Sequence, residues 1–420
     1  MLILMFLGIP IAYAITISSF LYILLVGDLS PVIVVQQIAA GADSLVLLAL
    51  PFFLLAGEIM NRSKITERLT RFVLLLIGPR RGGLSLVVVV ANVLIAMVSG
   101  AAIASAAAVG STMIPMMRRQ GYPKEFAAAL NASAATIGPV IPPSIGFIIY
   151  ASVSGQSVGK LFLAGIIPGL LIGLTMIILC AILAVRHDHP RGESHGFKEI
   201  LGSFFDALPG LFMPIIILGG IFGGLVTPTE AGVLAVVYGL IVGLFIYRTL
   251  NIADLPQIFL ETVRRSASIL FIIAGASCFG FLISRDVDAE QLIAGVQTVV
   301  VAPWMLLPIL LGLILFLGCF MEGGSIMIIL TPLLLPILAQ YGVDPIHFGV
   351  IFQVAIMIGL LTPPVGILVF VISGVSGVAV KDIFRNLLPF YLALLVTLFL
   401  LTYIPALSLC LVHQFGGLSQ

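Results

Sequence analysis

The segment Ile137-Gly138-Pro139-Val140-Ile141-Pro142-Pro143-Ser144 interrupts an apolar stretch in its middle. A related segment, Ile358-Gly359-Leu360-Leu361-Thr362-Pro363-Pro364-Val365, does the same 221 residues later. Two prolines in succession end a helix, because proline has no N–H for the helical ladder and restricts the residue before it. Carbonyls without partners are costly in a bilayer unless they are buried in protein or line a polar cavity. Each break therefore indicates a binding site at membrane depth.

The two helix ends created by the first break have opposite polarity. The half-helix that ends at Thr136–Gly138 directs free carbonyls at the gap, which suits a cation such as Na⁺. The half-helix that starts near Pro142–Pro143 offers the N–H groups of Ser144, Ile145 and Gly146, which suit an anion. Two such breaks at matching places in two halves of a chain are the best sequence indication of a transporter's binding site.

The composition indicates a polytopic membrane protein. Of the 420 residues, 61% are hydrophobic and 9% are charged, and the mean hydropathy is +1.26. At about 20 residues per crossing, the uncharged runs hold roughly ten to twelve helical spans and two re-entrant elements. The sequence has no alternating polar strands, so the predicted fold class is all-α, in an inner-type membrane. The net charge of +1 gives no reason to expect a nucleic-acid partner.

The chain contains an internal repeat. A constant shift of 221 residues superposes Gly138 on Gly359, Pro142-Pro143 on Pro363-Pro364 and Lys160 on Lys381 without gaps. Identities in glycine, proline and lysine do not persist by chance in one register, so the two halves are copies of one unit. Because broken helices usually accompany inverted repeats, we expect the two copies to have opposite orientations in the membrane.

The repeat predicts the domain organisation. We expect a first repeat, a polar linker and a second repeat at residues 1–185, 186–205 and 206–420. Each repeat is expected to hold scaffold helices and a re-entrant helical hairpin, the hairpins lying at about 95–120 and 312–341. Each is also expected to hold a broken helix, at about 125–155 and 346–378.

Several shorter patterns have local interpretations. Glu58 lies four residues before Arg62, which is typical of an interfacial ion pair. Thr227-Pro228-Thr229-Glu230 has the order of a capping box, so Glu230 is expected to cap a helix. The amphipathic pattern of residues 61–81 predicts an arm at the membrane interface. His187 and His189, without further partners at ligand spacing, are interpreted as solvated loop histidines.

Glu322 is the only charged residue between Glu290 and Asp344. A carboxylate in such a neutral stretch lies either at a hairpin tip that reaches water or in a functional cavity. The neighbouring glycines favour a tip, and both interpretations stay open.

At the two proline breaks the sequence resembles the large membrane subunit of the tripartite ATP-independent periplasmic (TRAP) transporters, within the ion transporter superfamily. The resemblance extends over nearly the whole chain. It includes Gly8-Ile9-Pro10-Ile11-Ala12, Pro51-Phe52-Phe53-Leu54-Leu55-Ala56-Gly57-Glu58-Ile59-Met60, Thr227-Pro228-Thr229-Glu230-Ala231 and Leu330-Thr331-Pro332. Family members often have Ser-Gly-Ser in the first hairpin, where this chain has Ser99-Gly100-Ala101.

The resemblance implies a sodium-driven importer of a small organic acid in the inner membrane of a bacterium, and no enzymatic activity. It implies two protein partners, a small four-helix membrane subunit and a soluble periplasmic protein that delivers the substrate. It also implies an elevator motion, in which the hairpins and broken helices slide against a scaffold. Membrane lipid surrounds such a protein, and Na⁺ is its expected cofactor, at about two sites.

The hypothesis for the sites follows the repeat. The first sodium site is expected to use Ser99, Ser105, Thr136, Gly138 and Val140, and the second Gly323, Ser325, Ile358, Gly359 and Thr362. Backbone and hydroxyl oxygens in such numbers suit a monovalent hard cation. The substrate is expected near Pro142, Ser144, Ile145, Gly146, Val365 and Gly366. Glu322 is assigned a gating or ion-related role.

Two alternative functions follow from the same residues. A stand-alone sodium-coupled carboxylate transporter of the same superfamily needs no partner. An intramembrane enzyme acting on lipid phosphates also contains repeats and hairpins, although the sequence shows no metal-ligand constellation for it. The substrate itself is open between a sugar acid such as sialic acid and a C4-dicarboxylate.

Overall fold

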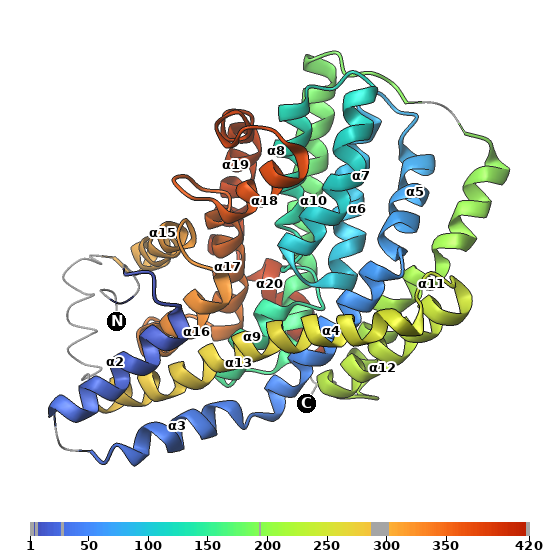
Figure 1. The fold of residues 1–420 in the computed structure, drawn as a ribbon. Coiled ribbons are helices and arrows are strands. Elements are labelled where there is room, and N and C mark those ends of the chain that lie inside the picture. The colour runs from blue at the N-terminus through green and yellow to red at the C-terminus, as the bar shows by residue number, and fades with distance from the viewer. Residues whose placement is uncertain (1–3, 5–6, 27–28, 193–194, 287–301, 417–420) are drawn as a thin grey trace.

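A computed structural model describes residues 4, 7–26, 29–192, 195–286 and 302–416 (Figure 1). The ends of the two predicted repeats, at 1–3 and 417–420, and the stretch 287–301 lie outside these residues. Within the described ranges the chain is helical and forms no β-strand, so the predicted all-α class is confirmed. The main helices are α2 (Ile11–Val26), α3 (Val32–Ala42), α4 (Ala49–Arg62), α5 (Ile65–Ile77), α6 (Gly83–Ser99), α7 (Ala102–Arg119), α8 (Lys124–Ala135), α9 (Ile145–Ser154), α10 (Val158–Arg186), α11 (Phe197–Phe222), α12 (Pro228–Ile241), α13 (Leu255–Asp286), α15 (Leu306–Gly318), α16 (Gly323–Gln340), α17 (Pro345–Gly359), α18 (Ile367–Ser376), α19 (Val380–Tyr403) and α20 (Ala406–Phe415).

Among the described residues, six helices are long and apolar enough to cross a membrane, or seven if α3 and α4 form one bent span. By length and composition alone, this is fewer than the ten to twelve spans expected from the uncharged runs. The physical reason is that the breaks and hairpin tips divide several apolar runs into helices of 10 to 17 residues, which are shorter than the ~20 residues of a full crossing.

The helix boundaries follow the register of the sequence repeat. A shift of 221 residues moves α7 onto the bounds of α16, and moves the first residue of α8 onto the first residue of α17. In the view of Figure 1 the chain descends from α8 to α9 but rises from α17 to α18, so these two broken segments run in opposite directions.

Two hairpins and two broken helices pack into one unit, because each hairpin contacts the broken helices of both repeats. The first hairpin consists of α6 and α7, the second of α15 and α16, and the broken helices are α8–α9 and α17–α18. In each repeat the hairpin packs against the first half of its own broken helix. The second arm of each hairpin also packs against the second half-helix of the other repeat, α7 on α18 and α16 on α9. The two repeats are therefore joined at both hairpins.

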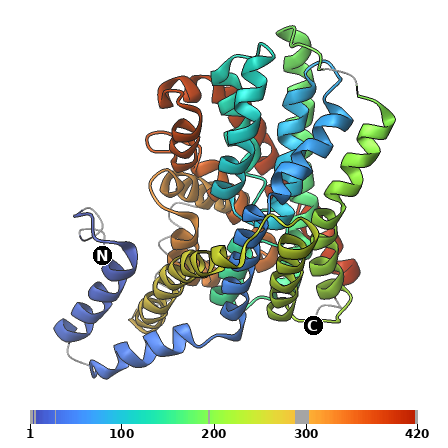
Figure 2. The same ribbon diagram turned by 45° about the vertical axis from the view of Figure 1, so that its right-hand side comes forward.

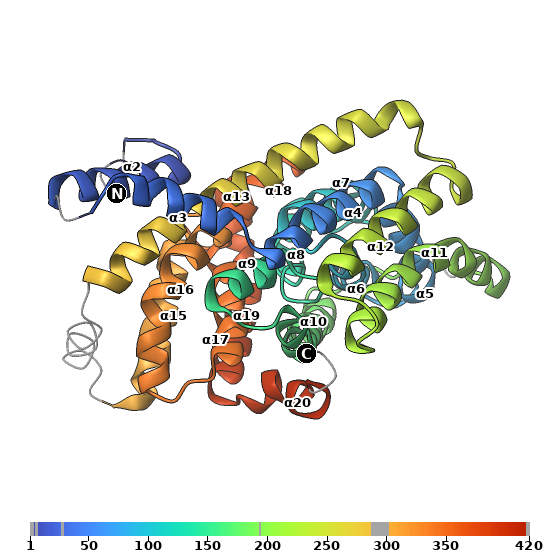
Figure 3. The ribbon, with the colours of Figure 1, turned by 90° about the horizontal axis from the view of Figure 1, so that it is seen from below.

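A second group of helices lies outside this unit. Figure 2 shows α2 and α3 projecting to one side, and Figure 3 shows the long helix α13 running beside them. Helix α13 packs against α2, α3 and α4, and α4 in turn packs against α12. The capping box that begins α12 is confirmed, because the Thr227 hydroxyl accepts the Glu230 N–H and the Glu230 carboxylate accepts the Thr227 N–H.

The predicted interfacial arm forms helix α5, but its apolar side is covered by protein. Ile65, Leu69 and Val73 are buried, and α5 packs along both α6 and α11. The predicted linker at 186–205 is also partly helical, because α11 begins at Phe197. Phe204 of α11 lies 5.5 Å from the ring of Phe72, a contact between aromatic side chains that sequence spacing does not reveal.

His189 is buried, which corrects its interpretation as a solvated loop residue, whereas His187 is exposed. The His189 ring lies 4.8 Å from the Tyr122 ring and 4.9 Å from the Phe126 ring. Burial, reinforced by His187 and Arg81, lowers the pKa of His189. The loop is fixed to the α5–α6 turn, because Gly82 donates its N–H to the Pro190 carbonyl.

Candidate functional site

The first break leaves backbone oxygens free inside the protein. Helix α8 ends at Ala135, the Pro142-Pro143 bond is cis, and residues 136–144 are buried. In the described part of the chain, the carbonyls of Thr136, Gly138 and Val140 accept no backbone hydrogen bond. The Val140 oxygen points at α10, because a Cβ atom on Gly165 would lie 2.5 Å from it. The carbonyl oxygens of Thr136 and Gly138 therefore have no backbone hydrogen-bond partner, whereas the Val140 carbonyl oxygen points at α10.

The tip of the first hairpin rests on this break. A Cβ atom at Gly100 would lie 2.5 Å from the Pro143 carbonyl oxygen, and one at Gly138 would lie 3.4 Å from the Ala101 carbonyl. Beside this contact the hydroxyls of Ser99 and Ser105 are 3.0 Å apart. The structure thus brings the backbone of the tip against the break, next in sequence to Ser99, and hydroxyl and carbonyl oxygens are ligands that suit a hard monovalent cation.

The start of α9, where N–H donors for an anion are expected, is covered by neighbouring groups of the protein. The Ser144 hydroxyl accepts the Phe147 N–H at 3.3 Å and donates to the Pro139 carbonyl at 2.5 Å. Gly146 faces the buried side chain of Gln353, whose Oε1 would be 2.2 Å from a Cβ atom there. The Ile145 nitrogen faces the tip, 3.6 Å from the Cβ position of Gly100. Of the expected N–H donors, that of Ile145 faces the hairpin.

At the second break, the carbonyl oxygens at the helix end accept hydrogen bonds from the residues that follow them. The Ile358 carbonyl accepts the Leu361 N–H at 3.0 Å and the Thr362 hydroxyl at 2.8 Å, and the Gly359 carbonyl accepts the Thr362 N–H at 2.8 Å. Ile358, Gly359 and Thr362 therefore lie together as expected. Their oxygens, unlike those of Thr136 and Gly138, already take part in backbone turns.

The second hairpin meets this break through glycine. A Cβ atom at Gly318 would lie 2.9 Å from the Gly359 Cα atom, so the two backbones touch. Gly366 donates its N–H to the Cys319 carbonyl at 3.4 Å, and residue 365 lies in the same turn. The second proline pair, Pro363-Pro364, is also cis but exposed. Both breaks thus contain a cis bond between their two prolines, but the first proline pair is buried and the second is exposed.

Glu322 lies at the tip of the second hairpin and is exposed. It is the N-cap residue of α16, and its Oε2 atom would be 3.3 Å from a Cβ atom on Gly324. Ser325 is buried in the next turn, and Gly323 packs against Ile356 of α17. The structure therefore places Glu322 at a hairpin tip, beside the residues expected for the second sodium site.

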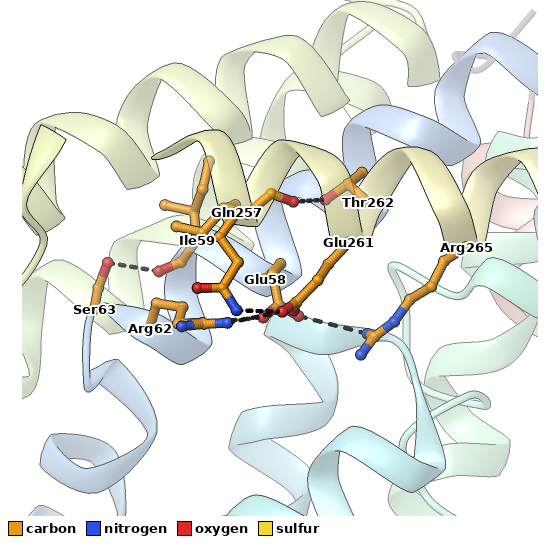
Figure 4. Close-up of polar contacts among 9 residues, drawn as sticks. Glu58, Ile59, Arg62, Ser63, Gln257, Glu261, Thr262 and Arg265 are labelled. Carbon is orange, nitrogen blue, oxygen red and sulfur yellow. Dashed lines mark hydrogen bonds and ion pairs between the residues drawn. The ribbon is translucent and has the colours of Figure 1, made fainter. Parts of the chain in front are cut away.

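A charged cluster across α4 and α13 was not predicted. The expected pair is confirmed, with Arg62 Nε 3.4 Å from Glu58 Oε1. Arg62 also contacts Glu261 at 3.0 Å, and Arg265 contacts Glu58 at 3.5 Å, as Figure 4 shows. Because α13 is about 200 residues away, spacing could not reveal these partners. Their one sequence signal is the presence of Glu261 and Arg265 within a long apolar helix.

Comparisons with known proteins agree with the resemblance in the sequence. Residues 1–407 match the family model described as "Tripartite ATP-independent periplasmic transporter, DctM component". The chain is 42% identical to the C4-dicarboxylate TRAP transporter large permease protein DctM of Pseudomonas aeruginosa, covering 88% of this chain and 87% of the relative. It is 35% identical to the sialic acid TRAP transporter large permease protein SiaM of Vibrio cholerae, covering 99% and 98%.

A solved structure shares the fold at lower identity. The YdaH transporter of Alcanivorax borkumensis, described as having an unusual topology, matches with a TM-score of 0.64 and 17% identity. The match covers 90% of this chain and 88% of that transporter. At this identity the likeness concerns the arrangement of the helices.

Proposed function

The chain belongs to the DctM component family of the tripartite ATP-independent periplasmic transporters, and we propose that it imports a small organic acid coupled to Na⁺. Its relatives are permeases, so it is a transport protein of the bacterial inner membrane and not an enzyme. The observation that carries the proposal is the contact between each hairpin tip and a broken helix. Such a contact forms a site whose oxygens come from two separable elements.

The first proposed sodium site uses the Ser99 and Ser105 hydroxyls with the Thr136 and Gly138 carbonyls. Hydroxyl and carbonyl oxygens without a full carboxylate favour a monovalent over a divalent ion. The unpaired state of the two carbonyls supports this site. Val140 is a weaker candidate, since its oxygen faces α10.

The second proposed site uses Gly323, Ser325 and the turn from Ile358 to Thr362. A carbonyl has two lone pairs, so the Ile358 and Gly359 oxygens can bind an ion while accepting a turn hydrogen bond. Glu322 at the tip places two carboxylate oxygens near this site, which supports an ion-related role. Bound sodium near both breaks attracts an anionic substrate, and each ligand then raises the affinity for the other.

The proposed motion is an elevator. The exchanged packing of α7 on α18 and α16 on α9 makes the hairpins and broken helices one body, whereas α2 and α3 pack chiefly on α13. In this proposal the body slides against the outer helices, carrying the ions and the acid. A bistable contact between two packed groups is the usual basis of such transitions.

Large permeases of this family work with a small membrane subunit and a periplasmic binding protein. We propose that this chain uses both, the first being a four-helix protein and the second delivering the acid. The named relatives support two substrate classes, a C4-dicarboxylate and sialic acid. A stand-alone carboxylate transporter is the alternative.

Reconstitution in liposomes tests the function. Vesicles that contain the chain with both partners are expected to accumulate labelled succinate or labelled sialic acid when a Na⁺ gradient is imposed. Omission of the binding protein is expected to abolish uptake. Uptake by the chain alone favours the stand-alone alternative, and equal uptake with a K⁺ gradient contradicts sodium coupling.

Thr362→Val is expected to raise the Na⁺ concentration for half-maximal uptake by about ten-fold, because an oxygen that interacts with a charge contributes ~1.5–3 kcal/mol. Thr397→Val is a matched control. Both hydroxyls bond a carbonyl four residues earlier and a second hydroxyl 3.2 Å away, but Thr397 lies in α19 facing Thr175 of α10. Equal sodium dependence in the two variants, measured by uptake at varied Na⁺, speaks against the second site.

A further inference from the structure

A pocket lies between the first hairpin tip and the charged cluster of α4 and α13. Its lining includes Glu58, Asn61, Ser99, Ala101, Ala104 and Arg265. At Gly57, helix α4 lies close to the first hairpin tip, since a Cβ atom on Gly57 would be 3.6 Å from the Ser99 carbonyl oxygen. The pocket therefore borders the first proposed sodium site and has a guanidinium on its opposite side.

The four charges of the cluster are unevenly satisfied. The Glu58 side chain is 11% exposed and is shared by Arg62 and Arg265, while Arg62 also contacts Glu261. The Arg265 side chain is 59% exposed, and its described ion pair is a single contact at 3.5 Å. A guanidinium has five N–H donors. Most of the Arg265 donors thus have no described partner, and Arg265 is one of the residues that line the pocket.

We propose that this pocket binds the carboxylate of the transported acid before the body of hairpins and broken helices slides, with Arg265 of the outer helix α13 as its cationic partner and Ser99 and Asn61 as neutral donors. The inference rests on the proposed function and adds the group that recognises the substrate's charge. A planar guanidinium binds a carboxylate through two parallel hydrogen bonds. Neutral solutes of similar size lack that interaction, so Arg265 gives the pocket its selectivity for acids.

Arg265 can exchange Glu58 for the substrate carboxylate at little cost in free energy, because Glu58 has a second partner. When the substrate carboxylate binds Arg265, Glu58 loses its 3.5 Å contact but keeps Arg62 at 3.4 Å. No charge is left unpaired in the cluster, which avoids the cost of an isolated buried charge. Glu58 is then a competitor for Arg265 rather than part of the binding site. Because Ser99 belongs to both sites, binding of the acid and of Na⁺ are adjacent events.

The test compares Arg265→Gln, Arg265→Lys and Glu58→Gln in the reconstituted complex, with labelled succinate and labelled sialic acid as probes. Arg265→Gln is expected to raise the KM of the transported acid by about 10- to 100-fold, because a hydrogen bond to a charged group contributes that much. Arg265→Lys is expected to recover part of the affinity. Arg264→Gln is the matched control, since it removes the same charge from the neighbouring exposed residue of α13 and is expected to leave the KM unchanged.

Glu58→Gln distinguishes a role of Arg265 in binding the acid from a role of the Glu58–Arg265 ion pair in holding α4 to α13. If Arg265 binds the acid, removing its competitor lowers the KM or leaves it unchanged, opposite to the effect of Arg265→Gln. If the ion pair only holds α4 to α13, both variants impair uptake together, and the inference is overturned. Stabilisation of the purified chain by Na⁺ without acid is expected to be the same in all variants, which shows that they fold.

The outcomes distinguish the inference from the proposed function. Uptake of either acid with the same KM in Arg265→Gln and the parent overturns the inference and leaves the function intact. Failure of the parent complex to take up both acids, with Na⁺ and both partners present, overturns the proposed function and with it the inference.

Discussion

Replacing Gly100 by alanine is expected to abolish most sodium-coupled uptake. Gly100 has a φ of +58°, and a Cβ atom there would lie 2.5 Å from the Pro143 carbonyl oxygen, which is backbone and cannot rotate away. The tip must therefore move off the first break, separating Ser99 and Ser105 from the Thr136 and Gly138 carbonyls. Loss of one such oxygen from an ion costs ~1.5–3 kcal/mol, or about 10- to 100-fold in Na⁺ affinity.

Gly155→Ala is the matched control for Gly100→Ala. Gly155 has a φ of +69° at the end of α9, but no atom lies within 4 Å of its Cβ position. Both variants carry the strain of a left-handed alanine, roughly 1 kcal/mol, and only Gly100→Ala meets the break. Uptake and half-saturating Na⁺ should be measured for both. Similar values in the two variants would contradict the role given to the first hairpin tip.

Replacing Gly359 by alanine is expected to impair uptake and to destabilise the protein. A Cβ atom at Gly359 would lie 2.8 Å from the Gly318 Cα atom, where α15 and α17 touch through backbone alone. Small residues allow such close approach, and forcing extra volume into a packed contact costs about 1–3 kcal/mol. The second hairpin would be pushed from its break, so uptake should fall along with the melting temperature in detergent.

Gly312→Ala separates this effect from the general cost of changing a helical glycine. Gly312 lies in α15, one of the two helices that meet at Gly359, and its Cβ position is open. An alanine there should raise helix propensity by up to ~1 kcal/mol and leave uptake intact. A Gly359→Ala variant as stable and active as Gly312→Ala would show that the contact between α15 and α17 does not need glycine.

Gly100→Ala and Gly359→Ala alter two contacts within the same packed unit of hairpins and broken helices. Each tip rests on the break of its own repeat, while the second arms of the hairpins exchange partners between repeats. Displacing one tip therefore disturbs the half-helix that supports the other repeat. This packing gives a physical route by which occupancy of one proposed ion site affects the other, through contacts that have discrete arrangements.

Local features were predictable because their causes are local. The proline breaks, the capping box of Thr227 and Glu230, and the pairing of Glu58 with Arg62 each depend on a few neighbouring residues. Contacts between distant segments were not predictable. The cover of Gly146 by Gln353, the contact of the His189 ring with the Tyr122 ring and the packing of α5 on α11 all join residues far apart in the chain.

The sequence by itself determined that this is an all-α membrane protein with a 221-residue repeat and two broken helices, since proline chemistry and hydropathy act within a few residues. Only the tertiary structure decided which oxygens at the breaks stay unpaired and that Arg265 faces the first hairpin tip across a pocket. Those outcomes depend on how helices from two repeats pack, and side-chain volumes and glycine contacts that set the packing have no signature in local spacing.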